Sequence, residues 1–257
     1  SIQTILTPSE LASCPSGTLS YWNFDESSGT DAFDVYGRNN GTLNGSTFTQ
    51  YGKINNALAT NGIDYSRALV NFSQDLNLSA NGRFTVMIWA KPNSSGGNPS
   101  VLRSGESGGN ERIVLDISLG SWRFVTRNST GDALSLVGNA VTVGVWTNLA
   151  ATWDGSNVKF YENGVFVDGT PLASIDDDST GFGIGGPPHT FSGLTFNGTL
   201  DELIYLNRSL DATEISSLYG NSSLGANYCA SYTLVTGCGT LNSVNETYIL
   251  TQNVNSS

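Results

Sequence analysis

Positive charge is scarce in this sequence. The 257 residues contain 11 Lys and Arg against 22 Asp and Glu, so the formal net charge is −11, and charged residues make up only 13% of the chain. Proteins that hold nucleic acid cluster Lys and Arg against the phosphates, and proteins that dock on anionic membranes cluster them against the lipid headgroups. The composition therefore excludes a nucleic-acid partner and disfavours an anionic membrane surface.

Long hydrophobic runs are also missing. The densest run, residues 86–90, is five residues long, whereas a membrane-spanning helix needs about 18 consecutive apolar residues. The first six residues have neither a basic opening nor a sustained apolar segment, so they are not an intact signal peptide and read as a processed end. We expect no membrane insertion.

Cysteine is nearly absent from the body of the chain, because Cys14 lies near its start and Cys229 and Cys238 near its end. A disulfide from Cys14 to either of the others would close almost the whole chain into one loop and stabilise it by up to about 5 kcal/mol. A local Cys229–Cys238 bond and three reduced thiols are the alternatives, and the spacing leaves all of them open.

Catalytic patterns are lacking as well. The one histidine, His189, has no catalytic serine signature beside it. Retaining glycosidases need two carboxyl groups about 5.5 Å apart, which a strand supplies at even spacing on one face. Asp201 and Glu202 are adjacent, so we expect them to point to opposite faces, and Glu111 and Asp116 are an odd number of residues apart. We therefore expect no enzyme activity.

Asn-x-Ser/Thr sequons are abundant. Chance alone in an Asn-, Ser- and Thr-rich chain would make about half as many, so we expect several to carry N-glycans on a secreted or cell-surface protein. The sequons are at Asn40, Asn44, Asn71, Asn77, Asn93, Asn128, Asn197, Asn207, Asn221, Asn245 and Asn255.

Short β-branched and aromatic runs separated by Gly, Asn, Asp or Pro dominate the pattern, and helical periodicity is almost absent. About a dozen strands need a two-sheet sandwich. Asn163-Gly164 predicts a type I′ hairpin, and Gly120 suggests another. The predicted strands are 18–23, 57–60, 67–70, 84–91, 100–103, 112–119, 121–127, 146–153, 157–162, 165–168, 181–184 and 200–207.

A single short helix is predicted at residues 211–220. Asp211 and Glu214 match the capping-box pattern, and Gly220 falls where a left-handed C-terminal cap belongs. Ile215, Leu218 and its neighbour Tyr219 share a face, so the helix is expected to lie against the sandwich.

Seven motifs in order make residues 17–220 resemble a laminin-G-like, pentraxin-like domain of the concanavalin A-like lectin/glucanase superfamily. This resemblance implies an all-β fold, an antiparallel two-sheet jelly-roll sandwich. Residues 1–16 and 221–257 fall outside it as extensions that contain the β-prone segments 2–6, 228–235 and 247–254. The motifs are LSYWNFDE from Leu19, NGTLNG from Asn40, GKINNAL from Gly52, FTVMIWAKP from Phe84, WTNLAATWDG from Trp146, YENG from Tyr161 and FNGTLDELIYLNRSL from Phe196.

Four aspartates are candidate ligands for a structural Ca²⁺, which takes six to eight oxygens from carboxylates, carbonyls and water. Asp25, Asp34, Asp64 and Asp201 lie at element ends or in Gly- and Asn-rich loops. The resemblance implies that a structural Ca²⁺ ties an early loop to the segment before the last core strand, with Asp25 and Asp201 as its ligands. In the alternative interpretation Asp25 caps a turn and Asp201 pairs with Arg208 or a backbone donor.

Tryptophan has two expected roles. Trp89, Trp146 and Trp153 alternate with small or polar residues, so we expect them to fill the space between the sheets. Trp22 and Trp122 are the candidates for exposed rings that stack on a sugar.

The pattern favours a non-enzymatic extracellular module for recognition or adhesion, which binds a glycan or a protein. The alternative is a glycosylated structural subunit of a surface filament or layer, in which a β-prone terminal segment adds a strand to another copy of the chain.

Overall fold

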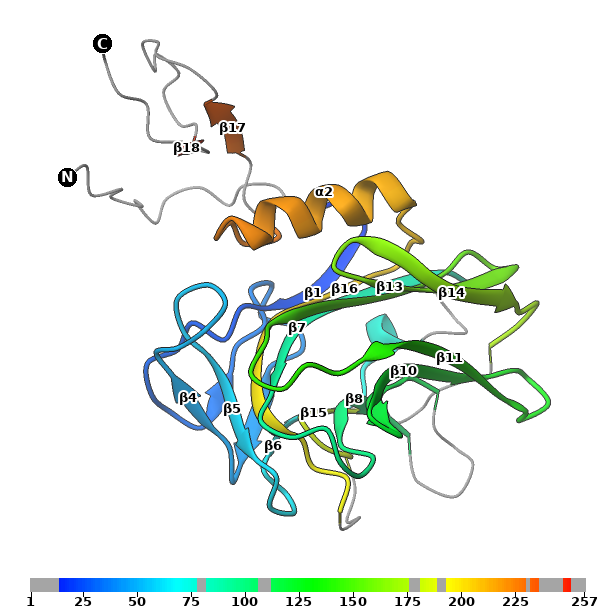
Figure 1. The fold of residues 1–257 in the computed structure, drawn as a ribbon, viewed down its shortest axis with the longest axis horizontal. Coiled ribbons are helices and arrows are strands. Elements are labelled where there is room, and N and C mark those ends of the chain that lie inside the picture. The colour runs from blue at the N-terminus through cyan, green and yellow to red at the C-terminus, as the bar shows by residue number, and fades with distance from the viewer. Residues whose placement is uncertain are drawn as a thin grey trace.

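The computed structural model describes residues 14–77, 82–105, 112–175, 181–188, 193–229, 232–235 and 247–250. The predicted strand 2–6 lies outside these residues, and so do His189, Cys238, Asn245 and Asn255. The described residues form two stacked β-sheets with a helix on one side (Figure 1).

The first sheet, sheet A, contains eight antiparallel strands. Its order is β14 (Val165–Pro171), β13 (Asn157–Glu162), β12 (Thr147–Trp153), β7 (Phe84–Pro92), β16 (Asn197–Leu206), β5 (Ala57–Asn61) and β4 (Thr47–Thr49), with β1 (Thr18–Trp22) paired to β16.

The second sheet, sheet B, also contains eight antiparallel strands. Its order is β11 (Ala133–Ala140), β10 (Ser121–Arg127), β9 (Val114–Ser118), β8 (Ser100–Ser104), β15 (Phe182–Ile184), β6 (Arg67–Val70), β3 (Gly41–Asn44) and β2 (Asp31–Ala32). A short 3₁₀ turn, η1 (Gln74–Leu76), follows β6. The predicted antiparallel jelly-roll sandwich is confirmed.

The main core lies between the sheets, because alternate side chains of each strand point inward. Burial alternates along β10: Trp122 and Phe124 are buried, whereas Arg123 and Val125 are partly exposed. Trp153 belongs to this core as predicted. Trp89 does not, since it lies on the opposite face of sheet A.

That opposite face is covered by the helix α2 (Ala212–Ser223) and carries a second hydrophobic cluster (Figure 1). Trp146 packs against this cluster rather than between the sheets, and Trp89 Nε1 donates to Ser222 Oγ at 3.1 Å. The predicted capping box of Asp211 and Glu214 is present.

The predicted end of the helix at Gly220 is wrong, since α2 continues to Ser223. The hydroxyl groups of Ser222 and Ser223 donate hydrogen bonds to carbonyl groups of the helix. Ser222 Oγ also accepts a hydrogen bond from Trp89 Nε1. Tertiary contact therefore extends the helix past a residue that would otherwise end it.

Both predicted hairpins form. Asn163 and Gly164 have φ values of 49° and 77° between β13 and β14, and Leu119 and Gly120 have φ values of 51° and 79° between β9 and β10. These left-handed backbone conformations match the twist of the flanking strands.

The last strands form a separate sheet. β17 (Tyr232–Val235) and β18 (Thr247–Leu250) pair in parallel and lie beyond α2 from the sandwich (Figure 1). They fall within the predicted segments 228–235 and 247–254.

Candidate functional site

The outer faces of the two sheets differ. α2 closes the outer face of sheet A, whereas no α-helix of the described residues lies on the outer face of sheet B (Figure 1). Thr42, Asn44 and Ser135 on this outer face are exposed. We call it the open face and take it as the candidate site.

Strand register gathers arginines on the open face, because residues directly opposite each other in neighbouring strands point to the same side. One row joins Arg123 to Asp116 and Asp116 to Ser100, while Arg67 lies opposite exposed Asn44. The arginines assigned to the open face by register are Arg67 (β6), Arg103 (β8), Arg123 and Arg127 (β10).

Acidic residues on this face are fewer among the described strands. Asp116, 1% exposed, accepts from Arg123 Nε at 2.9 Å and Nη2 at 2.6 Å, and this hydrogen bonding raises the pKa of Arg123. Asp31 lies at the edge, on β2 opposite Thr42. In a chain with a net charge of −11, the described strands of this face thus carry more arginines than aspartates, although Arg67 and Arg103 are buried.

One corner of the open face holds a buried guanidinium under an aromatic ring. Arg67 is 3% exposed, and its guanidinium carbon lies 5.1 Å from the centre of the Tyr65 ring. Nε and Nη1 of Arg67 are buried without a hydrogen-bond partner, and burial lowers the pKa of this arginine. Tyr65 is 41% exposed, and its φ of +74° is unusual for a bulky residue.

Two hydroxyl groups lie next to this corner. Ser100 and Thr195 form a β-bridge, and both hydroxyl oxygens are buried without a hydrogen-bond partner. Gly186 lies beside Thr195 and the arginine, since a Cβ there would be 3.5 Å from Thr195 Oγ1 and 3.5 Å from Arg67 Cβ. We call Tyr65, Arg67, Ser100, Gly186 and Thr195 the Arg67 corner.

Asp64, a predicted calcium ligand, instead supports this corner. Its Oδ1 accepts from the Gly193 N–H at 2.7 Å, which ties the loop that carries Tyr65 to the segment that carries Thr195. Asp64 does not lie with the other predicted ligands.

Asp34, another predicted calcium ligand, accepts hydrogen bonds from the backbone instead. Its buried carboxylate accepts backbone N–H groups of Tyr21, Tyr36, Arg38 and Asn39 at 2.9 to 3.2 Å. The carboxylate therefore orders the chain between β2 and β3.

Asp25 and Asp201 flank the same turn from two sides. Asp201 Oδ2 accepts from Ile54 N at 2.9 Å, and Asp25 accepts from Asn56 N and from Asn55 Nδ2, both at 3.2 Å. Burial raises the pKa of both aspartates. Their oxygens face N–H donors, where a Ca²⁺ site would need further oxygens.

The four predicted ligands therefore do not converge. Among the residues that the structure describes, no group of three or more His, Cys, Asp or Glu side chains is gathered so that it could hold a metal ion. Of the four, Asp25 and Asp201 share one turn, and the calcium site stays a prediction.

Trp22 and Trp122 are each 1% exposed and belong to the core between the sheets. Trp22 Nε1 donates to the Asn39 carbonyl at 2.8 Å. The prediction that they stack on a sugar is wrong, because the inward-pointing strand positions bury both rings.

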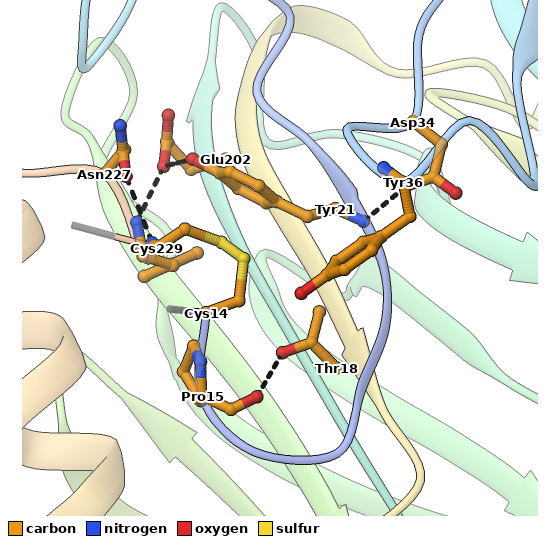
Figure 2. Close-up of a disulfide and its surroundings, with 10 residues drawn as sticks. Cys14, Pro15, Thr18, Tyr21, Asp34, Tyr36, Glu202, Asn227 and Cys229 are labelled. Atoms are coloured by element: carbon orange, nitrogen blue, oxygen red, sulfur yellow. Dashed lines mark hydrogen bonds between the residues drawn. A yellow bond between two sulfur atoms is a disulfide. The ribbon is translucent and has the colours of Figure 1, made fainter. Parts of the chain in front are cut away.

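Glu202 forms a buried polar cluster beneath the C-terminal segment (Figure 2). Its Oε2 accepts from the Tyr21 hydroxyl and from the Tyr228 N–H, and Asn148 Nδ2 donates to the Tyr228 hydroxyl. Burial raises the pKa of Glu202 to about 8.

The expectation that Asp201 and Glu202 point to opposite faces is wrong. The register of β16 with β7 shifts between Asp201 and Ile204, and Glu202 has a φ of 54°. This bulge brings both carboxyl groups to the face under α2. Both residues are 0% exposed, so a substrate has no access to the pair in this arrangement.

The disulfide joins Cys14 to Cys229 beside Glu202 (Figure 2). It links the two ends of the domain across 215 positions of sequence, which is one of the predicted pairings. Asn227 Oδ1 accepts from the Cys229 N–H at 3.1 Å and helps to position the C-terminal segment.

The sequons differ in accessibility. Most described sequon asparagines are exposed or partly exposed, but Asn77 is only 5% exposed, which disfavours a glycan there. Asn44 is exposed directly opposite Arg67. Among the described residues, no helix is long and apolar enough to cross a membrane.

Sequence reasoning did not identify the Arg67 corner. The alternation of Arg123, Val125 and Arg127 was an available signal for a basic strand face, but it does not reveal the register with β6 and β8. No sequence pattern marked Tyr65, because its position beside Arg67 depends on the fold of its loop.

Solved structures with similar folds include two toxin binding domains and an enzyme. The binding domain of Paraclostridial Mosquitocidal Protein 1 matches with 16% identity and a TM-score of 0.66, over 81% of this chain and 52% of that one. Trypanosoma rangeli sialidase matches with 18% identity and a TM-score of 0.64, over 88% and 37%. The Botulinum Neurotoxin serotype G binding domain matches with 14% identity and a TM-score of 0.62, over 79% and 50%.

At these identities the likeness shows the fold, and the chain spans about half or less of each structure's length. No curated protein matches the sequence. The family model of the concanavalin A-like lectin/glucanases superfamily, of the laminin G type, matches residues 64–216, more than half of the chain. The chain therefore belongs to the concanavalin A-like lectin/glucanases superfamily.

Proposed function

We propose that this protein is a non-enzymatic extracellular recognition module that binds a glycan or a protein on the open face of sheet B. The observation that carries the proposal is the contrast between the two outer faces. α2 and the C-terminal segment cover one, while the other presents arginines beside exposed polar side chains.

Family and neighbours support a binding role. The family is lectin-like, and two of the similar solved structures are binding domains of toxins. The disulfide and the exposed sequons favour an oxidising compartment and hence a secreted or cell-surface protein. The inaccessible Asp201 and Glu202 pair supports the absence of glycosidase activity.

The test is retention on an array of neutral and acidic glycans and on candidate extracellular proteins. Thr42→Trp places a large ring on the open face at an exposed position of β3, opposite Leu69. We expect it to weaken binding at least tenfold. Val165→Trp is the matched control at an exposed position of sheet A, and equal binding by both variants would contradict the proposal.

The second candidate function is assembly by strand addition, and a specific observation favours it. β17 and β18 form a two-stranded sheet, and no other described strand pairs with either one. Two strands alone are marginally stable in water, so a third strand is expected to complete the sheet. The disulfide holds Cys14 at Cys229, and β17 begins shortly after Cys229 in the sequence, at Tyr232.

The predicted strand 2–6 is the proposed donor, and a second copy of the chain is the proposed acceptor. Deletion of residues 1–13 is expected to abolish self-association in light scattering, and unchanged oligomers would exclude this role.

A further inference from the structure

We infer that Asn207 carries an N-glycan whose first sugar, N-acetylglucosamine, packs into a cavity between α2 and the segment that contains Pro15. The packed sugar ties the start of the domain to the helix. This inference goes beyond the proposed function, because the cavity lies on the side of the molecule that α2 covers, whereas the proposed recognition uses the open face.

The cavity has a volume of about 300 Å³, and we call it the α2 cavity. Its rim is accessible, because Thr213 and Ser217 are exposed. Sites for small ligands span roughly 300–1,000 Å³, so this space suits one sugar ring and not a chain of sugars. The lining residues are Pro15, Arg208 and Leu210 on one side and Thr213, Glu214, Ser217 and Leu218 of α2 on the other.

The polar part of the lining matches a neutral sugar. Thr213 and Ser217 lie one turn apart on α2, and their hydroxyl groups can each donate and accept a hydrogen bond. Arg208 Nη1 and Glu214 Oε1 form an ion pair at 2.8 Å. Because this pair neutralises its own charges, the cavity favours an uncharged ligand with hydroxyl and amide groups.

The apolar part of the lining matches the acetyl methyl group of the same sugar. Leu210 is only 2% exposed, and Leu218 and Pro15 are partly exposed beside it. Apolar surface of this kind gains free energy when a methyl group displaces water from it. N-acetylglucosamine therefore fits both parts of the cavity, whereas a sugar without the acetyl group uses only the polar part.

The position of Asn207 identifies the occupant. Asn207-Arg208-Ser209 is a sequon, Asn207 is exposed, and Arg208 of the same sequon lines the cavity. A Cβ at Gly17 would lie 2.8 Å from Asn207 Oδ1 and 3.2 Å from Arg208 Cγ, so these two side chains flank one point. A sugar on the Asn207 amide thus starts beside the cavity wall, and glycine at position 17 keeps the amide clear.

The modification itself is the ordinary transfer to a sequon in a secretory compartment. A bond forms between Asn207 Nδ2 and C1 of the sugar while the bond from C1 to the phosphate oxygen of a lipid diphosphate donor breaks. Nδ2 gives up one proton, and the lipid diphosphate leaves.

The cavity walls are held in place by the protein alone. Thr18 Oγ1 donates to the Pro15 carbonyl at 2.6 Å, and Cys14 next to Pro15 is in the disulfide (Figure 2). Asp211 N donates to Glu214 Oε2 at 3.0 Å within the capping box. A preformed site loses little entropy on binding, and a covalently tethered sugar is present at high effective concentration. Weak contacts with one sugar ring are therefore sufficient to hold it.

The experiment uses the full chain secreted from animal cells, whose N-glycans begin with N-acetylglucosamine. Mass spectrometry of peptides first measures occupancy at Asn207. The native protein is then treated with peptide N-glycosidase, which cuts between asparagine and the first sugar, and release is timed at each sequon. We expect release at Asn207 to be at least tenfold slower than at the exposed Asn44 and Asn93, with equal rates after denaturation.

Two helix variants locate the protection. Ser217→Trp fills the α2 cavity and is expected to raise the release rate at Asn207 to that at Asn44. Ser216→Trp, at the neighbouring exposed position that does not line the cavity, is the matched control and is expected to keep the protection. Both positions are exposed, so we expect both variants to melt at the temperature of the wild type once all three are deglycosylated.

Thermal unfolding gives a second measurement. Asn207→Gln is expected to lower the melting temperature of the glycosylated protein by at least about 2 °C, because it removes the packed sugar. Asn44→Gln, at an exposed sequon of the open face, should leave it unchanged.

Three results would overturn the inference: an Asn207 without a glycan, release at Asn207 as fast as at Asn44, or protection that survives in Ser217→Trp. Binding to the open face is measured separately on the array, so either account can fail alone.

Discussion

Glutamine at position 202 is expected to make the protein more stable than the wild type at alkaline pH and about equally stable at acidic pH. Glu202 is 0% exposed, and burial raises its pKa from 4.5 to about 8. The Tyr21 hydroxyl and the Tyr228 N–H donate to Oε2, and a protonated Oε1 leaves the group neutral. Glutamine has nearly the same shape as this neutral acid.

The direction of the change in stability with pH follows from proton linkage. A carboxyl group with a raised pKa in the folded state holds a proton that the unfolded chain has lost, so its contribution to stability is fully present below about pH 4.5 and is lost as pH rises through about 8. Each pH unit between these values is worth about 1.4 kcal/mol. The wild type should therefore lose on the order of 4 kcal/mol from this group between pH 5 and pH 8.

The assay is urea unfolding at several pH values between 5 and 8.5, followed by tryptophan fluorescence. Glu202→Gln should remove the part of the decline that Glu202 causes, while buried Asp201, whose pKa is also raised, keeps its own part. Asp75→Asn is the control at a carboxyl whose side chain is 47% exposed, in an ion pair with Arg38. A wild-type stability that does not fall over this range, or a variant that is less stable by the same amount at every pH, would contradict this role of Glu202.

Further predictions concern the termini, the buried carboxylate and calcium. Reduction of the Cys14–Cys229 bond, or its replacement by two serines, should lower the free energy of unfolding by up to about 5 kcal/mol in chemical denaturation; a loss under about 1 kcal/mol would show that the closure adds little. Asp34→Asn should cost about 2 kcal/mol, because the carboxylate accepts four backbone N–H groups, and unchanged unfolding would contradict that role. EDTA and added Ca²⁺ should leave the melting temperature unchanged, and a calcium-dependent rise that Asp25→Asn abolishes would restore the calcium site.

Local sequence signals predicted the regular parts of the sandwich. Alternation located β10 and β13, and the two positive-φ turns at Gly120 and Gly164 fixed their hairpins. The strands β2, β3, β4 and β11 were missed, because they are short or rich in Gly, Ser and Asn and depend on pairing with neighbours.

Side-chain roles were harder to predict, since they depend on contacts between distant segments. Trp89 looked like a core residue, but helix α2 buries it on the outer face of sheet A. The bulge at Glu202 reverses the expected direction of one carboxyl group. Arg67 acquires its significance only from the register that places Ser100 and Thr195 nearby.

The most direct test of the recognition role is a map of amide chemical shifts on the isotope-labelled protein, with the ligand that the array retains most strongly. We expect the largest changes on β6, β8, β9 and β10, the strands of sheet B. Changes confined to α2 and the β13–β14 hairpin would contradict it, because they would place recognition on the opposite side of the molecule.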